Sequence, residues 1–289
     1  METIAELRKI CQMTAKADRS NVYMRYVCRS LSIYLTRLIL PTKITANQVS
    51  FSMIVAGIFS TLFFLSPSPW LFFVGALLMQ FWYLLDCMDG EVARYREYQL
   101  CGSVVTDKRT AALSGIYYDI INHYIMNLLV PASISFGLYK KTGNDIFILF
   151  GIFGAVGQVL LLAMHDAKHR VILLHLKKKY REVVIIDKTE EKNSASRKRS
   201  LFHWMFMILH YTMTYPMVMN LILIAAIINL FGPIWEMRIC LLLYLTVGSA
   251  VVSATLITRT IAEQLIEKEF SEQFIPLVDS AAPLGKARE

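Results

Sequence analysis

Two short motifs with acidic residues at the ends of apolar runs decide how this chain folds. The first reads DCMDGEVAR at residues 86–94, and it closes an apolar run that begins at Trp70. The second reads GIYYDIINH at residues 115–123, and it opens another run that continues to Leu138. Acidic groups at the ends of membrane helices are costly unless a metal, a cation or water accompanies them. The motifs therefore predict a shared polar site at the ends of two hydrophobic helices.

Helical spacing predicts how the first motif is arranged. Asp86 and Asp89 fall on one face of a helix, and Gly90 and Ala93 extend that face with small side chains that leave room for a ligand. Arg94 adds a permanent cation whose planar fork suits a phosphate group.

The second motif places Gly115, Asp119 and His123 on one helical face. Three carboxylates, one imidazole and one guanidinium around a common space suit a hard divalent metal ion that holds a pyrophosphate. The alternative interpretation is a set of structural ion pairs at the helix ends.

Together the motifs resemble the signature of the CDP-alcohol phosphotransferase family, Asp-x-x-Asp-Gly-x-x-Ala-Arg followed by Gly-x-x-x-Asp-x-x-x-Asp. The family's fourth aspartate is His123 here, and the gap from Arg94 to Gly115 is longer than is usual in the family. Residues 45–50 resemble the family's Pro-Asn-x-x-Thr/Ser element, with Ala46 where proline is common. Asn47 then either serves the nucleotide or caps the helix together with Thr45.

The resemblance implies metal-dependent transfer of a phospho-alcohol group, with phosphatidyl favoured, from a CDP-alcohol to a hydroxyl acceptor. CMP is released, and the pathway would be phospholipid or related phospho-alcohol biosynthesis. The donor would be CDP-diacylglycerol or a CDP-linked headgroup. The ion would be Mg²⁺ or Mn²⁺, held by Asp86, Asp89, Asp119 and His123. The donor would be bound by Asn47, Asp86, Gly90, Ala93, Arg94 and Gly115.

His123 and Asp119 are the expected catalytic residues. An imidazole, with an ordinary pKa of about 6.5, is a competent base at neutral pH and can also bind a metal. The missing fourth aspartate and the long insert at residues 95–114 keep a second hypothesis open, a catalytically weakened relative that binds nucleotide or lipid without turnover. A transporter with a carboxylate-lined cation path is disfavoured because the acidic groups fall at helix ends.

Composition indicates a membrane protein. Hydrophobic residues make up 55% of the 289-residue chain, in several runs of membrane-spanning length. The formal net charge of +8 fits positively charged cytoplasmic loops, and no nucleic-acid-binding signature accompanies it.

The predicted fold is an all-α integral membrane protein with six transmembrane helices and an N-terminal amphipathic interfacial helix. Residues 1–40 would form cytoplasmic or interfacial helices, and the segment 21–40 would lie in the headgroup layer. Residues 41–265 would form the membrane domain, including a cytoplasmic loop at 165–203, and residues 266–289 a polar tail. The expected spans are 45–65, 70–98, 113–139 with a kink at Pro131, 145–164, 205–230 and 236–260.

Both ends of the chain are expected to lie in the cytoplasm, so the site would face the cytosol. In a prokaryotic cell, the membrane would be the inner or plasma membrane. The insert, from Glu97 to Ala112, has the character of a surface loop or a lid. Homodimerisation is common in the family that the motifs resemble.

Overall fold

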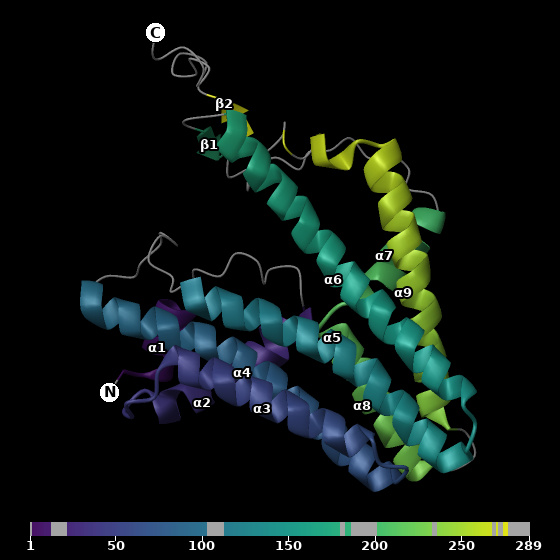
Figure 1. The fold of residues 1–289 in the computed structure, drawn as a ribbon. Coiled ribbons are helices and arrows are strands. Elements are labelled where there is room, and N and C mark those ends of the chain that lie inside the picture. Colours follow the sequence, from purple (N-terminus) through teal and green to yellow (C-terminus); the bar gives the residue numbers. More distant parts are fainter. Residues whose placement is uncertain are drawn as a thin grey trace.

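The long elements of the chain are all helices. The computed structural model describes residues 2–12, 22–102, 113–179, 183–185, 201–232, 236–267, 270 and 274–276. Helices α3 (Ala46–Phe64), α4 (Pro69–Cys101) and α5 (Leu113–Thr142) lie side by side (Figure 1). Helices α6 (Ile146–Lys179) and α9 (Met237–Ala262) form a second group, which meets α5 at one end and diverges from it toward the other (Figure 1).

Shorter elements surround these helices. They are α1 (Ile4–Cys11), the π-helical stretch η2 (Met24–Cys28), α2 (Arg29–Ile39), α7 (Leu201–Thr212) and α8 (Met217–Phe231). Two strands, β1 (Val183–Ile185) and β2 (Phe274–Pro276), pair antiparallel. Helices α1 and α2 pack against α4, and α8 packs between α4 and α9.

Among the described residues, four helices are long and apolar enough to cross a membrane, which is consistent with a membrane protein. They are α3, α9 and the segments Pro69–Leu100 of α4 and Ile146–His175 of α6. Helices α7 and α8 bend by 75° relative to each other and supply a fifth span if they are counted together. Helix α5 falls outside this group because Asn122, His123 and Asn127 lower its mean hydropathy. The prediction of an all-helical membrane protein is thus confirmed at this coarser level.

Local sequence signals explain where the central helices begin and end. Thr45 and Gln48 form a reciprocal capping box at the start of α3, in which each side chain bonds the other's backbone N–H. Pro69 occupies the first turn of α4, where its missing N–H has no helical partner to lose. Helix α4 stops at Gly102, whose φ of 68° is a left-handed conformation that glycine adopts readily.

Several predicted boundaries are wrong because helices outlast the apolar runs that suggested them. Helix α4 continues through Cys101, so the first residues of the predicted insert are helical, while 103–112 lie outside the described residues. Helix α6 continues through Lys179 instead of giving way to a loop at 165. Pro131 lies inside α5, as expected, and the kink predicted there stays a prediction. The C-terminal tail contributes strand β2.

Helix α6 contacts its neighbours through glycines at every third position, which we call the glycine seam: Gly151, Gly154 and Gly157. A Cβ at Gly151 would lie 2.0 Å from Ser135 Oγ of α5, and one at Gly157 would lie 2.1 Å from Ser249 Oγ of α9. Both distances are shorter than any tolerable contact, so the helix backbones approach closely here. Small residues serve the same purpose at helix interfaces in membranes.

A buried polar cluster ties helix ends together at the opposite end of α4 from the acidic motif. Arg238, whose side chain is fully buried, donates to the carbonyls of Ser66 and Pro67, each at 3.0 Å, and to both carboxylate oxygens of Glu236. Lys141 also pairs with Glu236. Burial raises the pKa of Glu236, but the hydrogen bonds from Arg238 and Lys141 outweigh it and lower that pKa to about 2. We call this the Arg238 cluster.

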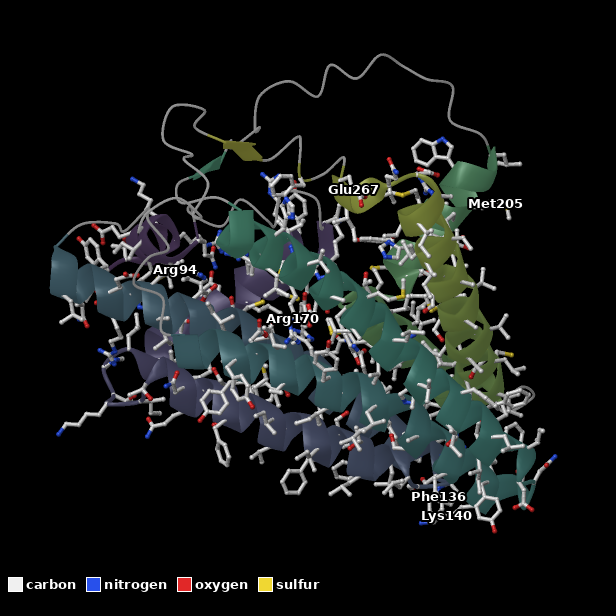
Figure 2. All side chains as sticks on the ribbon, turned by 45° about the horizontal axis from the view of Figure 1, so that its top comes forward. Arg94, Phe136, Lys140, Arg170, Met205 and Glu267 are labelled. Carbon is white, nitrogen blue, oxygen red and sulfur yellow. The ribbon has the colours of Figure 1, made fainter. Side chains whose placement is uncertain are left out.

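The acidic motifs lie far from the Arg238 cluster. In Figure 2, Phe136 and Lys140 mark the end of α5 that lies near this cluster, and Arg94 lies toward the other end of the molecule. The two ends of the helix bundle therefore differ in chemistry: one is held by the Arg238 cluster, and the other carries the acidic motifs.

Candidate active site

A cavity of about 320 Å³ lies where the acidic motifs of α4 and α5 meet the start of α3. Its lining includes every predicted donor-binding residue and three of the four predicted metal ligands, all but His123: Asn47, Asp86, Asp89, Gly90, Ala93, Arg94, Gly115 and Asp119. Ala46, Ser50, Glu97 and Ile116 complete it. Asp86, Asp89, Gly90 and Ala93 thus lie on one face of α4, as their helical spacing predicted. The walls of the cavity come from three helices: α3, α4 and α5.

Three side chains in and beside the cavity form a group that could hold a metal ion. Asp86, Asp119 and His123 each offer a ligand atom, and these atoms all lie within 4.8 Å of one another. His123 Nε2 lies 3.3 Å from Asp119 Oδ1 and 4.0 Å from Asp86 Oδ1.

This group fits a divalent ion on its own chemistry. Asp119 Oδ1 is buried, yet its contact with His123 lacks hydrogen-bond geometry and no described residue donates to it. A buried carboxylate oxygen needs a donor or a cation. Two carboxylates and an imidazole are suitable ligands for a first-row or alkaline-earth divalent ion.

Asp89 lies in the same cavity but outside this group. Its Oδ2 accepts a hydrogen bond of 2.7 Å from Ser50 Oγ of α3. Ser50 is three residues after Asn47 and so shares its helical face. Asn47 does not supply the helix cap, because Thr45 and Gln48 do. Asn47 instead lines the cavity, with its Oδ1 3.8 Å from where a Cβ would stand on Gly115.

Aromatic side chains fix the ring of His123 beneath the cavity. The indole of Trp82 meets the imidazole edge to face, with ring centroids 5.4 Å apart, and the ring of Tyr215 lies 5.9 Å away. Trp82 is fully buried and donates through Nε1 to Asn122 Oδ1 at 3.3 Å. With its ring held on two sides, His123 directs Nε2 toward the carboxylates.

Arg94 is held in a defined orientation by the N-terminal helix. Its Nε donates to the backbone carbonyl of Cys11, the last residue of α1. Its Nη atoms lie over Gly90, where an added Cβ would be 3.1 Å from Nη1 and 3.3 Å from Nη2. The guanidinium therefore folds back over the preceding turn, and Gly90 provides the space that it occupies.

Glu91, within the same motif, faces away from the cavity and joins three elements. It is fully buried, and Gln12, Ser32 and Thr36 each donate to its carboxylate at 2.7 Å. These donors come from the end of α1 and from α2, so one carboxylate links both N-terminal helices to the motif.

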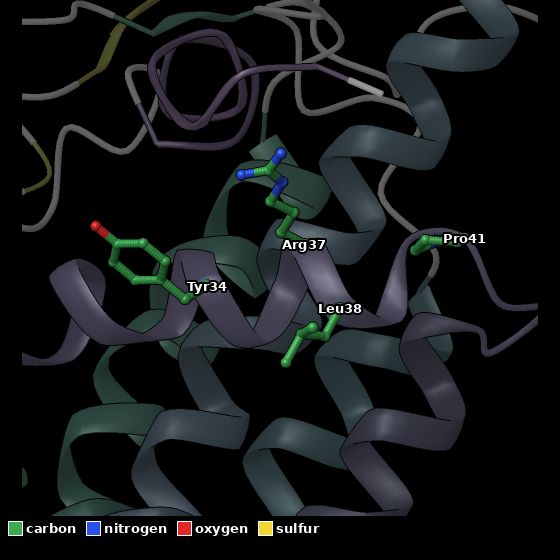
Figure 3. A pocket seen from close by; sticks show the side chains of 4 residues that line it. All are labelled: Tyr34, Arg37, Leu38 and Pro41. Carbon is green, nitrogen blue, oxygen red and sulfur yellow. The ribbon is translucent and has the colours of Figure 1, made fainter.

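Helix α2 consequently turns its hydroxyl side chains inward and part of its apolar surface outward. Ser32 and Thr36 are buried, whereas Leu38 is 73% exposed and Tyr34 54% exposed. A hollow of about 470 Å³ on this outer face is lined by Tyr34, Arg37, Leu38 and Pro41 (Figure 3). An apolar exposed face with a basic side chain is typical of a helix at a membrane surface.

Sequence reasoning missed several residues of this site. Glu97 lines the cavity and carries a spacing signal, because it follows Arg94 by three residues. Ser50 also lines it; the motif at residues 45–50 included this serine, but no role in the site was assigned to it. Cys11 and Gln12 carry no such signal, because their contacts depend on how the N-terminal helix packs.

Comparison with protein-family models finds none that matches the chain, and no curated protein matches it either. The function of the site therefore rests on its geometry and on the resemblance of its motifs.

Proposed function

We propose that this protein is a CDP-alcohol phosphotransferase, which transfers a phospho-alcohol group from a CDP-alcohol to a hydroxyl acceptor and releases CMP. The observation that carries the proposal is the meeting, at one cavity, of a potential metal group with an oriented guanidinium. Asp86, Asp119 and His123 form the group, and the Nη edge of Arg94 lies over Gly90 in the same wall. A divalent ion and a guanidinium both bind and neutralise the oxygens of a pyrophosphate.

The chain's own residues divide the work of binding. Asp86 and Asp119 would hold Mg²⁺ or Mn²⁺, with Asp89 oriented toward it by Ser50. The bound ion would neutralise the phosphate oxygens and the departing CMP. Arg94 would bind the pyrophosphate through Nη1 and Nη2, since Nε is already engaged by Cys11.

His123 would act as the base. Its Nε2 would take the proton of the acceptor hydroxyl while that oxygen forms a bond to the phosphorus bearing the alcohol and the bond from this phosphorus to CMP breaks. Trp82 and Tyr215 hold the ring, so the imidazole need not reorient during the reaction. Oxygen-preferring Mg²⁺ leaves the imidazole free for this role.

The outer face of α2 and the length of the helices support a membrane arrangement for this reaction. In it, α5 and the α7–α8 pair join the four apolar helices to make six spans, and α2 lies in the headgroup layer of the cytoplasmic leaflet. The cavity would then open at the cytoplasmic surface, within reach of a lipid-linked donor.

Binding of the donor tests the proposal without knowledge of the acceptor. We would measure binding of CMP and CDP-diacylglycerol to purified protein, with and without Mg²⁺ or Mn²⁺, for wild type, Asp86→Asn and the matched control Asp145→Asn. Asp145 is exposed at the α5–α6 turn. We expect metal-dependent binding in wild type and the control and its loss in Asp86→Asn. Absence of binding to folded wild-type protein would contradict the proposal.

The substitution of His123 for the family's aspartate favours one second candidate, a relative that binds the nucleotide without turnover. Release of CMP from bound CDP-diacylglycerol in the presence of mixed polyol acceptors separates the two. Binding with no release of CMP under any acceptor would support the second candidate.

A further inference from the structure

The orientation of Arg94 depends on a segment far away in the sequence. An arginine has five N–H donors, and a phosphate is bound most specifically when a fixed pair of them faces it. Here Nε is used by the carbonyl of Cys11, and the Nη atoms are turned over Gly90. Without the Cys11 carbonyl, the flexible arginine stem would let the guanidinium leave this position.

The carbonyl of Cys11 suits a cation. It belongs to the C-terminal end of α1, where helix carbonyls lack helical partners and carry partial negative charge. Helix α1 is itself seated firmly: Leu7 and Cys11 are fully buried in a cluster with Ile33, Leu40 and Tyr95.

Gln12 fixes the chain immediately after that carbonyl. Its Nε2 donates to Glu91 Oε1 at 2.7 Å and to the backbone oxygen of Arg29 at 2.8 Å. Glu91 lies three residues before Arg94 on α4, so the same short stretch of α4 receives two contacts from the end of α1.

From these contacts we propose that α1 and Gln12 are a positioning device for Arg94, and that they set the affinity of the cavity for a pyrophosphate-containing ligand. The nature of that ligand rests on the proposed function. Leu7 seats the helix, Gln12 fixes its end on Glu91, and the Cys11 carbonyl orients the guanidinium. None of these residues lines the cavity.

The test combines two point variants with a double-mutant cycle on the full-length protein. Gln12→Ala removes the bond to Glu91, and Leu7→Ala loosens the packing of α1. Gln99→Ala is the matched control, since Gln99 is exposed on α4 and its side chain bonds, among the described residues, the side chain of Arg96 alone. Each change is made in wild type and in Arg94→Ala.

We expect Gln12→Ala and Leu7→Ala to weaken binding of CDP-diacylglycerol with Mn²⁺ about tenfold, the scale of one hydrogen bond to a charged group. In the Arg94→Ala background neither change should weaken binding further, because both act through Arg94. Equal losses in both backgrounds would show a general effect on folding and overturn the proposal.

A second readout needs no nucleotide. Phenylglyoxal modifies accessible guanidinium groups, and peptide mass spectrometry follows its rate at Arg94. We expect faster modification of Arg94 in Gln12→Ala and Leu7→Ala than in wild type and Gln99→Ala. An unchanged rate would refute the positioning role. If wild-type protein binds no CDP-alcohol, the proposed function fails, and the modification rate still decides whether α1 positions Arg94.

Discussion

Replacement of Arg238 by methionine should destabilise the protein strongly. The arginine is fully buried, and methionine offers no donor to replace the hydrogen bonds that its partners would lose. The change removes four hydrogen bonds: one each to the carbonyls of Ser66 and Pro67, and two to Glu236. Breaking a buried ion pair by removing one partner typically costs about 3–5 kcal/mol. Glu236 keeps its bonds from Lys141 and Asn229, so we expect the lower end, about 3 kcal/mol.

Lys141→Met is the matched control, since it removes the other cation that pairs with Glu236. The lysine side chain is 43% exposed, and exposed ion pairs contribute about 0–1 kcal/mol. The free energy of unfolding of both variants can be measured by titrating SDS into mixed micelles and following tryptophan fluorescence. If Arg238→Met lost no more stability than Lys141→Met, burial would not be the deciding factor and the reasoning would be refuted.

Three further predictions concern charge and the cavity. The pKa of Glu236 is depressed in the folded state, to about 2 from the ordinary 4.5. The contribution of Glu236 to stability should therefore be full above pH 4.5 and disappear as the pH falls toward 2. A Glu236→Gln variant that kept the wild-type acid dependence of unfolding would contradict this. Ser50→Ala should weaken Mn²⁺ binding about tenfold, because it releases Asp89 from its hydrogen bond. The hydroxyl of Ser52 bonds a helix carbonyl instead, so Ser52→Ala should leave Mn²⁺ binding unchanged. An electron paramagnetic resonance titration measures both. His123→Ala should slow CMP release by about a hundredfold or more, and full activity in that variant would exclude the base role.

Features that depend on a single helical turn could be predicted from the sequence. The starts of α3 and α4 follow from Thr45, Gln48 and Pro69, whose effects extend over a single turn. The ends of α4 and α6 were misplaced, because a hydrophobic run marks where a membrane could lie and helical hydrogen bonds continue beyond it into polar sequence. Lys179 is helical for this reason although the apolar run ends much earlier.

The candidate site divides in the same way. Spacing on one helix placed Asp86 near Asp89, and spacing on another placed Asp119 near His123. The resemblance of the motifs joined the two helices. Spacing could not show that Ser50 would donate to Asp89, nor that Arg94 would bond Cys11, 83 residues away in the sequence. Such contacts depend on tertiary packing, which no periodicity encodes.

The glycine seam has a consequence for how α6 can move. Its close contacts with α5 and α9 exist where a residue lacks a side chain, and the neighbouring positions carry bulky ones: Ile152, next to Gly151, is 54% exposed, and Val156, next to Gly157, is 58% exposed. A slide of α6 by one residue, or a turn about its own axis by one position, would drive such a side chain into Ser135 or Ser249. The seam therefore holds α6 in register, so a change of shape in this part of the protein would have to pivot about these contacts instead of sliding along them.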